Sequence, residues 1–416
     1  MVMNETTTKI FPYLERLLDG EEVEWKTLGD KEYISIENNA RKAVNSRSRI
    51  PGETPYYGAN NIQDYVEGYT HDGVYILIAE DGTASIEQYS IQWAEGKFWA
   101  NNHVHVIRGT EKINNRFLYY FLKTVNFTPF LMGGGRAKLT KAKLQEIPFA
   151  IPPLRVQARI VEILDKFTQL EAELEAELEA RRKQYAYYRD QLLDFSQSSP
   201  LNVNIEWKTL GEIMEIVTDF TAAGSFASNA QNVRYLQEPN YALLVRTTDI
   251  KQGFKATDKF VYVDQHAFEY LWRVNLDKEC VILPNVGNCG EVYHSSPSIL
   301  PYTKCVLGPN AILVRSEKVS NKFLFYLFQA AYFQKELAKI TSTAGQGKFN
   351  KTNLKQINLP IPPLSEQRRI VDILDRFDTL TNSISEGLPK EIALRRKQYA
   401  YYRDALLSFP RPEVSA

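Results

Sequence analysis

Two glycine-containing basic segments carry residue types that can approach phosphate groups. They are 132–143 (MGGGRAKLTKAK) and 343–355 (TAGQGKFNKTNLK). Glycine lets a backbone N–H come close to a phosphate, while Lys and Arg supply the opposite charge. An ordinary loop before a strand has a similar composition. The two segments occupy corresponding places in the two halves of the chain, which favours phosphate contact.

The short motifs that resemble catalytic sequences are incomplete. GQGKFN is not a P-loop, because Ser342 stands where the first glycine is required and no Ser or Thr follows the lysine. IPPL, at 151–154 and 361–364, has Ile where an adenine methyltransferase motif has Asp or Asn. The E-x-K triplets at 24–26 and 206–208 lack an upstream Pro-Asp, so we interpret them as structural. We find no nucleophile–base signature, and we expect no catalytic residue in this chain.

Metal and disulfide chemistry are equally unsupported. His103 and His105 would share one face of a strand, but no third ligand is evident, so we expect no metal site. Cys280, Cys289 and Cys305 are odd in number and match no zinc spacing. They are typical of reduced core thiols, which predicts a cytoplasmic protein.

Composition indicates a soluble globular chain of two or three domains. The 416 residues are 44% hydrophobic and 24% charged, and neither an 18-residue apolar run nor a secretory signal is visible. The charges balance at 50 against 50, yet they are segregated. Five glutamates fall within 171–179, whereas 38–52 and 134–143 are basic without an acid. The distribution of charge is therefore more informative than its sum.

The chain contains two copies of one unit. The repeated pairs are EWKTLGD 24–30 and EWKTLGE 206–212, NRFLYYF 115–121 and NKFLFYL 321–327, KLTKAKLQEIPFAIPPL 138–154 and KFNKTNLKQINLPIPPL 348–364, RIVEILDKF 159–167 and RIVDILDRF 369–377, and RRKQYAYYRD at both 181–190 and 395–404. Between the first two markers the copies barely match, and the second is 24 residues longer. Uniform drift would spread the differences evenly, so each copy combines a constant frame with a variable insert.

The constant parts predict long helices. Residues 154–195 contain no Gly or Pro, and Ile160, Ile163, Phe167, Leu170 and Leu174 follow the three–four spacing of a coiled-coil seam. About 42 residues would make a rod of roughly 60 Å. The second helical region spans about 364–409, and its Gly387 and Pro389 predict a kink or break. We expect the two rods to pack antiparallel about a pseudo-two-fold axis, with the chain ends close together.

The variable parts, 25–150 and 207–360, predict mixed α/β domains. Strands are expected at YILIAED, HVHVIRG, YALLVRTTD, CVILPNVG and AILVRS. One helix each is expected at 117–125 and 323–340. The predicted fold class is α+β, with an N-terminal segment and first insert domain (1–150), a central helical region (151–200), a second insert domain (201–360) and a distal helical region (361–416).

These repeated segments resemble a known family. IPPLxxQxRIVxILDxF, the EAEL-type tetrads and RRKQYxYYRDxLLxF are similar over the full length to the specificity subunits of type I restriction–modification systems. The resemblance implies a non-catalytic DNA-binding subunit. Each insert would be a target-recognition domain for one half of a bipartite, asymmetric double-stranded DNA site, and the helices would fix the gap.

The resemblance also implies the partners. Two methyltransferase subunits, which modify adenine using S-adenosylmethionine, would dock on the helices, and two ATP-driven restriction subunits would join the full assembly. S-adenosylmethionine, ATP and Mg²⁺ are expected in those partners and no cofactor in this chain. No membrane association is expected.

Candidate contact residues follow from this interpretation. Arg and Asn offer bidentate hydrogen bonding to guanine and adenine. The expected DNA-binding residues are Arg47, Arg49, Tyr57, Asn60, Asn61, Arg136 and Lys138 in the first insert, and Arg246, Thr247, Thr248, Asn285, Asn288, Lys348 and Lys351 in the second. A surface that meets two identical partners must stay the same in both copies. The expected docking residues are therefore Arg181, Arg182, Lys183, Arg189, Arg395, Arg396, Lys397 and Arg403.

Two other classes of function remain open at this point. A structural coiled-coil scaffold that binds only protein would leave no sequence-specific DNA footprint. An enzyme with an unrecognised site would be active as the purified chain alone.

Overall fold

The computed structural model describes residues 11–133, 137–195, 204–342, 345–383 and 386–411. Its contacts divide the chain into two units. Unit 1 comprises Met1–Ala176 with Glu391–Ala416, and unit 2 comprises Glu177–Lys390. Each unit therefore holds one insert domain together with parts of the long helices. No helix among the described residues is long and apolar enough to cross a membrane.

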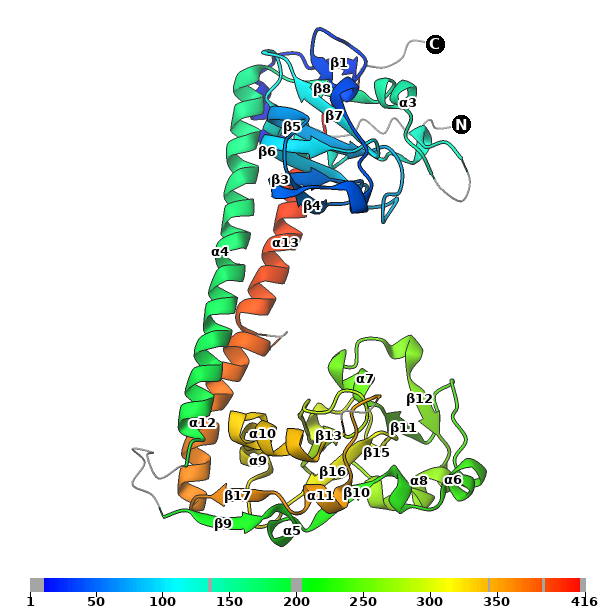
Figure 1. The fold of residues 1–416 in the computed structure, drawn as a ribbon, viewed down its shortest axis with the longest axis vertical. Coiled ribbons are helices and arrows are strands. Elements are labelled where there is room, and N and C mark those ends of the chain that lie inside the picture. The colour runs from blue at the N-terminus through cyan, green and yellow to red at the C-terminus, as the bar shows by residue number, and fades with distance from the viewer. Residues whose placement is uncertain (1–10, 134–136, 196–203, 343–344, 384–385, 412–416) are drawn as a thin grey trace. The chain divides into compact units, whose positions relative to one another are not determined.

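A six-stranded sheet forms the first insert domain (Figure 1). Its order is β2 (Ile34–Ile36), β7 (Val104–Gly109), β5 (His71–Ala79), β6 (Ile91–Ala100), β3 (Pro51–Tyr57) and β4 (Ile62–Val66). All neighbours are antiparallel except β3 and β6, which are parallel. The strands predicted at YILIAED and HVHVIRG are confirmed as parts of β5 and β7. Their apolar runs are buried because helix α2 (Asn115–Leu122) packs on the sheet.

Smaller elements complete unit 1. They are α1 (Pro12–Leu18), α3 (Lys141–Gln145) and the 3-10 turns η1 (Asn38–Ala40), η2 (Ser46–Ser48) and η3 (Thr128–Phe130). The first and last described segments pack together here, as the sequence predicted. The ring of Phe11 lies 6.5 Å from that of Tyr402, and Trp25 Nε1 donates to Pro410 O at 2.7 Å.

Unit 2 has a different sheet arrangement. One sheet has the antiparallel order β10 (Ile216–Asp219), β16 (Ala311–Arg315), β13 (Cys280–Pro284), β14 (Tyr293–Ser295); the other has the order β12 (Val261–Val263), β11 (Ala242–Val245), β15 (Cys305–Leu307). β15 pairs with β11 in parallel. The strands predicted at YALLVRTTD, CVILPNVG and AILVRS are confirmed as β11, β13 and β16. The two insert domains therefore differ in topology as well as in sequence.

Short helices connect these strands. They are α5 (Leu210–Ile213), α6 (Phe226–Asn232), α7 (Thr247–Lys251), α8 (Gln265–Tyr270), α9 (Asn321–Gln329), α10 (Ala331–Ile340), α11 (Lys351–Leu354) and the turns η4 (Phe220–Ala222), η5 (Thr257–Lys259), η6 (Trp272–Val274) and η7 (Pro297–Ile299). The single helix expected at 323–340 is wrong, because the chain bends at Ala330 (ψ 149°) into α9 and α10. The bend allows Phe333 to stack on Phe328, with ring centroids 4.3 Å apart, in the core.

Each insert begins and ends on neighbouring strands. In unit 1, β1 (Glu24–Thr27) pairs with β8 (Pro148–Ile151), so Trp25 lies opposite Ala150. In unit 2, β9 (Glu206–Thr209) pairs with β17 (Asn358–Ile361), so Trp207 lies opposite Pro360. The repeated EWKT therefore forms the same two-stranded closure in both units.

Three helices carry the constant regions. Helix α4 (Leu154–Leu192) has 39 residues, as the absence of Gly and Pro predicted. The distal region is α12 (Leu364–Asn382) and α13 (Gly387–Leu406), so the expected interruption is confirmed. Gly387 has φ +74°, and a Cβ there would lie 2.5 Å from Thr379 O. Glycine is required at this turn because both the conformation and the space exclude a side chain.

Helix α4 uses two apolar faces. Val156, Ile160 and Leu164 are fully buried in the core of the first domain. Phe167 instead stacks on Tyr402 of α13, with ring centroids 5.5 Å apart. The seam spacing predicted the second face, but it wrongly assigned Ile160 to the seam, since this residue lies on the first face with Val156 and Leu164. In unit 2, Phe377 of α12 stacks on Tyr188 of α4 in the same manner, at 5.8 Å.

Candidate nucleic-acid interface

A buried glutamine fixes each insert domain to its constant helix. In unit 1, Gln157 Nε2 donates to Pro152 O, and its Oε1 accepts from Asn114 N, both at 2.8 Å. In unit 2, Gln367 Nε2 donates to Pro362 O at 2.8 Å, and Gln367 Oε1 accepts from Ser320 N, directly before α9, at 3.0 Å. The glutamine of IPPLxxQ thus ties the start of the long helix to the start of the domain helix.

A tyrosine–aspartate pair is repeated about two helical turns further along each constant helix. Tyr120 donates to Asp165, and Arg116 Nε lies 2.8 Å from the same carboxylate. The corresponding residues in unit 2 are Tyr326, Asp375 and Lys322, whose ammonium lies 3.2 Å from the carboxylate. Burial, and then the hydrogen bond to the aspartate, raise the pKa of Tyr120 and likewise that of Tyr326. Both phenols therefore remain donors at neutral pH.

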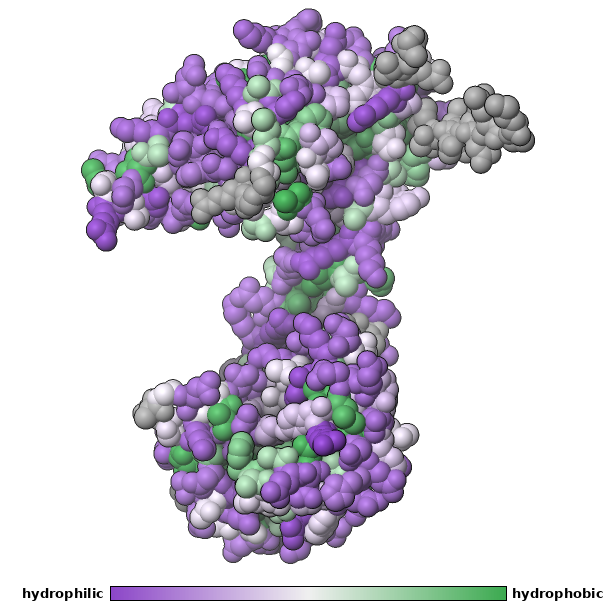
Figure 2. Space-filling view, turned by 90° about the vertical axis from the view of Figure 1, so that its right-hand side faces the viewer, coloured by the Kyte–Doolittle hydropathy of each residue, from purple (hydrophilic) through white to green (hydrophobic). Residues whose placement is uncertain are grey.

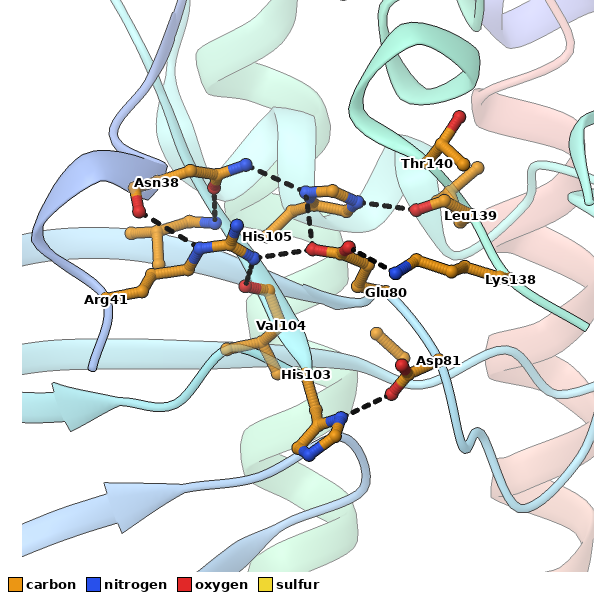
Figure 3. Close-up of polar contacts among 12 residues, drawn as sticks. Asn38, Arg41, Glu80, Asp81, His103, Val104, His105, Lys138, Leu139 and Thr140 are labelled. Atoms are coloured by element: carbon orange, nitrogen blue, oxygen red, sulfur yellow. Dashed lines mark hydrogen bonds and ion pairs between the residues drawn. The ribbon is translucent and has the colours of Figure 1, made fainter. Parts of the chain in front are cut away.

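In the first domain, Glu80 joins two candidate segments (Figure 3). Its Oε2 lies 2.7 Å from Arg41 Nη1, and its Oε1 lies 3.0 Å from Lys138 Nζ. Burial acts to raise the pKa of Glu80, but hydrogen bonds from Arg41 and Lys138 hold that pKa below its usual value. The carboxylate therefore anchors the basic segment 137–143 to the end of β5. Lys138 keeps 48% of its side chain exposed, so it remains accessible while anchored.

The two histidines next to this cluster occupy different environments (Figure 3). His103 lies in the turn before β7 rather than in the strand, and its Nδ1 contacts Asp81. His105 is buried in β7 between Asn38 and Leu139 O, and burial lowers its pKa. Across the described ranges, no three His, Cys, Asp or Glu side chains gather in a way that could hold a metal ion.

The β3–β4 turn lies at the same end of the sheet as Lys138. Asn60 Nδ2 donates to Gly82 O, and its Oδ1 accepts from Ala84 N, both at 2.8 Å. Asn60 therefore bonds the loop that begins two residues after Glu80, the residue that pairs with Lys138. The adjacent Asn61 is exposed, and its Oδ1 accepts from the next backbone N–H.

Other predicted residues of the first domain have mixed positions. Arg49 is engaged inside the domain, since Nη1 lies 3.3 Å from Asp64 and its guanidinium lies 4.1 Å from the centroid of the Tyr56 ring. Arg47, in η2, is exposed. Tyr57 is half-buried, and its ring packs edge-on against the buried ring of Phe98. Arg136 lies outside the described residues.

In the second domain, Arg246 supports a short helix. Its Nη2 lies 2.7 Å from buried Asp249 and donates to Lys259 O at 2.6 Å. The guanidinium N–H groups of Arg246 therefore bond mainly to atoms within the protein. Thr247 and Thr248 form the first turn of α7, and Thr248 is exposed.

Three further predicted residues, Asn285, Lys348 and Lys351, meet in one cavity of about 660 Å³. Lys351 Nζ lies 2.8 Å from Asp219, whereas none of the described side chains pairs with the ammonium of Lys348. Asn288 is exposed in the turn after β13 and does not line the cavity. The sequence predicted these polar residues separately, and the fold brings three of them together.

The aromatic lining of this cavity was not predicted. Phe226, at the start of α6, is 92% exposed, and Tyr235 is 53% exposed. Figure 2 shows hydrophobic patches on the surface of unit 2 within a mainly hydrophilic face. One signal was available in the sequence, because Phe226 is the only large apolar residue in GSFASNAQN.

The identical decapeptides have partly identical environments. Arg189 and Arg403 each lie 5.8 Å from the centroid of a tyrosine ring one turn earlier, and each pairs with the following aspartate. Arg181 and Arg395 each contact a glutamate four residues before and a glutamine three residues after. Exposed Tyr187 and Tyr401 also correspond. These matched positions form two equivalent surfaces.

The other predicted docking residues differ between copies. Arg396 bridges Glu171 and Glu175 on α4 within unit 1. No described carboxylate pairs with Arg182, its counterpart. Lys183 pairs with Glu179, whereas the equivalent position before Lys397 is Ala393. The surface that the two copies share therefore includes only some residues of the decapeptide.

Comparison with known proteins agrees with this arrangement of two domains on a repeated frame. A family model described as the type I restriction modification DNA specificity domain matches the chain twice, at residues 21–180 and 202–394. The chain therefore belongs to the family of type I restriction–modification specificity subunits, as the sequence resemblance indicated.

Individual relatives span nearly the whole chain. A putative type I restriction enzyme specificity subunit of Haemophilus influenzae is 44% identical over 418 residues, covering 95% of this chain and 98% of its own. The EcoR124I/EcoR124II specificity subunit of Escherichia coli is 31% identical over 425 residues, covering 97% and 98%. The crystal structure of the S subunit from M. genitalium has a TM-score of 0.54 at 14% identity, covering 94% and 97%. At 14% identity, the similarity to this structure concerns the fold alone.

Proposed function

We propose that this chain is the DNA-reading subunit of a type I restriction–modification enzyme and has no catalytic site of its own. Each insert domain reads one half of a bipartite, asymmetric DNA site. The observation that carries this proposal is the pair of different domains on matching frames. The Gln157 and Gln367 clamps hold them in the same way, while their sheets differ in order and strand number.

The constant helices separate the two half-sites in this proposal. Helix α4 is one continuous helix that contributes to both units, and α13 also contributes to both. The aromatic contacts of Phe167 with Tyr402 and of Phe377 with Tyr188 support antiparallel coiled-coil packing about a pseudo-two-fold axis. A continuous helix rises about 1.5 Å per residue, so its length sets the gap.

Two methyltransferase subunits dock on equivalent surfaces in this proposal. Arg181 with Tyr187, and Arg395 with Tyr401, supply the matched positions. The methyltransferase subunits supply S-adenosylmethionine, and two restriction subunits supply ATP and Mg²⁺ chemistry. We expect Tyr187→Ala and Tyr401→Ala each to weaken one docking event and the double variant to weaken both. The mass of the purified assembly would then correspond to two methyltransferase subunits for the native chain, one for each single variant and none for the double variant.

The central test is co-expression with the partner methyltransferase, followed by mapping of methylated adenines. The proposal predicts one bipartite methylated sequence. Replacing residues 25–150, from β1 to β8, should change one half of that sequence and leave the other half and the gap intact. A swap that changes both halves, or neither, would contradict the assignment of one domain to one half-site.

A further inference from the structure

The cavity beside α6 in unit 2 has the chemistry of a nucleobase site. Its volume of about 660 Å³ lies within the roughly 300–1,000 Å³ typical of small-ligand pockets. Groove readout requires only a protruding surface, whereas a concave site of this size can enclose one planar group. The fold therefore provides more than a flat contact surface at this point.

Aromatic groups line the entrance. Phe226 and Tyr235 line the cavity and are 92% and 53% exposed. Two exposed aromatic rings at the mouth of one cavity form an apolar surface that a planar ligand can cover. Bases stack on such rings, because every base has a π-face.

One residue of the cavity lining, Asn285, has a polar atom that lacks a partner in the part of the protein that the structure describes. Asn285 Nδ2 donates to Phe349 O at 3.3 Å, which fixes the orientation of the amide. Its Oδ1 is buried and accepts no hydrogen bond from any described residue. A buried acceptor without a donor is unfavourable, so this oxygen suits an incoming N–H. The exocyclic amines of adenine and cytosine are such donors.

The rim carries positive charge. The ammonium of Lys348 is exposed, and Lys351 lies beside it, paired with Asp219. A nucleotide whose base enters the cavity would place its phosphate outside, where Lys348 can reach it. The lining thus offers a stacking surface, an acceptor for a base amine and a cation for the phosphate.

We propose that this cavity receives one nucleobase that leaves the helical stack in the second half-site, with Phe226 as the stacking residue and Asn285 Oδ1 as the acceptor. The inference rests on the proposed function, since it concerns how the second domain reads its DNA. Asn285 Oδ1 accepts from any base that presents an N–H to it, so the amide contributes affinity and orientation rather than the identity of the base.

The experiment uses the full complex with its methyltransferase subunits and its mapped target duplex. Fluorescent analogues, 2-aminopurine for adenine and pyrrolocytosine for cytosine, replace each base of the second half-site in turn. The methylated adenine is left out, because methyltransferases extrude their target base themselves. We expect fluorescence to rise on binding at one position. Phe226→Ala should abolish that rise and weaken binding roughly 5- to 150-fold.

Variants separate stacking from other effects. Phe226→Trp should retain the fluorescence rise, whereas Phe226→Leu, which is apolar without a π-face, should lose it. Ile299 is a matched control, because it is 53% exposed in the same unit and does not line the cavity. Ile299→Ala should bind and fluoresce as the native protein does. Since Phe226 is exposed, its variants should unfold at the native temperature.

The outcomes distinguish this inference from the proposed function. No rise at any position, or a rise that persists in Phe226→Ala, would overturn the nucleobase site even though bipartite methylation continued. Loss of bipartite methylation in the native complex would overturn the proposed function itself.

Discussion

Asn38 Nδ2 lies 2.9 Å from His105 Nδ1, and this contact defines the protonation state of the buried imidazole. Asn38 Oδ1 accepts from Val106 N at 2.9 Å, so the amide nitrogen must face the ring. On the other side, His105 Nε2 lies 2.7 Å from Leu139 O and can only donate. His105 is therefore neutral with its proton on Nε2, and it links β7 to the segment that carries Lys138.

The first prediction is that unit 1 loses stability as the pH falls below about 6.5. Burial lowers the pKa of His105, so the unfolded chain binds the proton more readily than the folded chain. The contribution of His105 is fully present above the unfolded pKa of about 6.5 and is lost as the pH falls through the folded pKa. Urea unfolding of the full chain between pH 8 and pH 5.5 measures this loss.

His103 provides the control for this prediction. His103→Gln should keep the pH dependence, because it leaves the contacts of His105 with Asn38 and Leu139 intact. His105→Gln should reduce the pH dependence to the part that comes from His294 in unit 2, whose pKa burial also lowers. It should cost about 1–3 kcal/mol at pH 8, since a buried partner is left unsatisfied. An unchanged pH profile in His105→Gln would contradict the prediction.

How far the sequence predicted the fold depends on the distance between interacting residues. The continuous helix α4, the break at Gly387 and the five apolar strands follow from local composition, and all were predicted. The bend at Ala330 was not, because it results from the packing of Phe333 on Phe328 in the core rather than from Gly or Pro.

The candidate site was less predictable for the same reason. Asn285 and Lys348 were selected from their types, but their meeting in one cavity depends on β-bridge pairing between segments 62 residues apart. The Glu80 anchor likewise joins the residue that follows β5 to the 137–143 segment. Arg49 and Arg246 matched the pattern of base readers, yet Asp64 and Asp249 bind them within the protein.

The second prediction concerns the glutamine clamps. Gln157→Ala should destabilise unit 1 by about 1–3 kcal/mol, because the buried Pro152 O and the partly buried Asn114 N both lose their partner. Gln169 is the matched control, since its side chain is exposed on the same helix and donates to Glu173 one turn further on. Gln169→Ala should change the free energy of unfolding by less than about 0.5 kcal/mol. Equal effects of the two substitutions in urea unfolding would rule out the clamp.

The third prediction compares two arginines from identical decapeptides. Arg396→Ala should lower the unfolding temperature more than Arg182→Ala, because Arg396 bridges Glu171 and Glu175. The side chain of Arg396 is 57% exposed, so screening by solvent limits the effect to about 0.2–1 kcal/mol. The difference should shrink in 1 M salt, where charges are screened within about 3 Å. A difference that persists in high salt would indicate that packing, not charge, distinguishes the two positions.

The fourth prediction concerns the length of α4. Adding one LEAE tetrad within 170–181 lengthens the helix by ~6 Å. DNA rises ~3.4 Å per base pair along each strand. The unread gap should therefore widen by one or two base pairs while both half-sites keep their sequences. Mapping methylated adenines for the insertion, and for a Glu177→Ala variant of unchanged length, measures the gap. A gap that stays constant in the insertion variant would exclude the helix as its determinant.

The pairing of β1 with β8, and of β9 with β17, has a consequence for how such chains diversify. The ends of each insert lie opposite each other in an antiparallel pair, about 5 Å apart. A foreign domain needs only two adjacent chain ends to be grafted there, whatever its internal topology. Genetic exchange within the repeated EWKT and IPPL segments could then create a new DNA specificity in a single recombination event, without any change to the rest of the subunit.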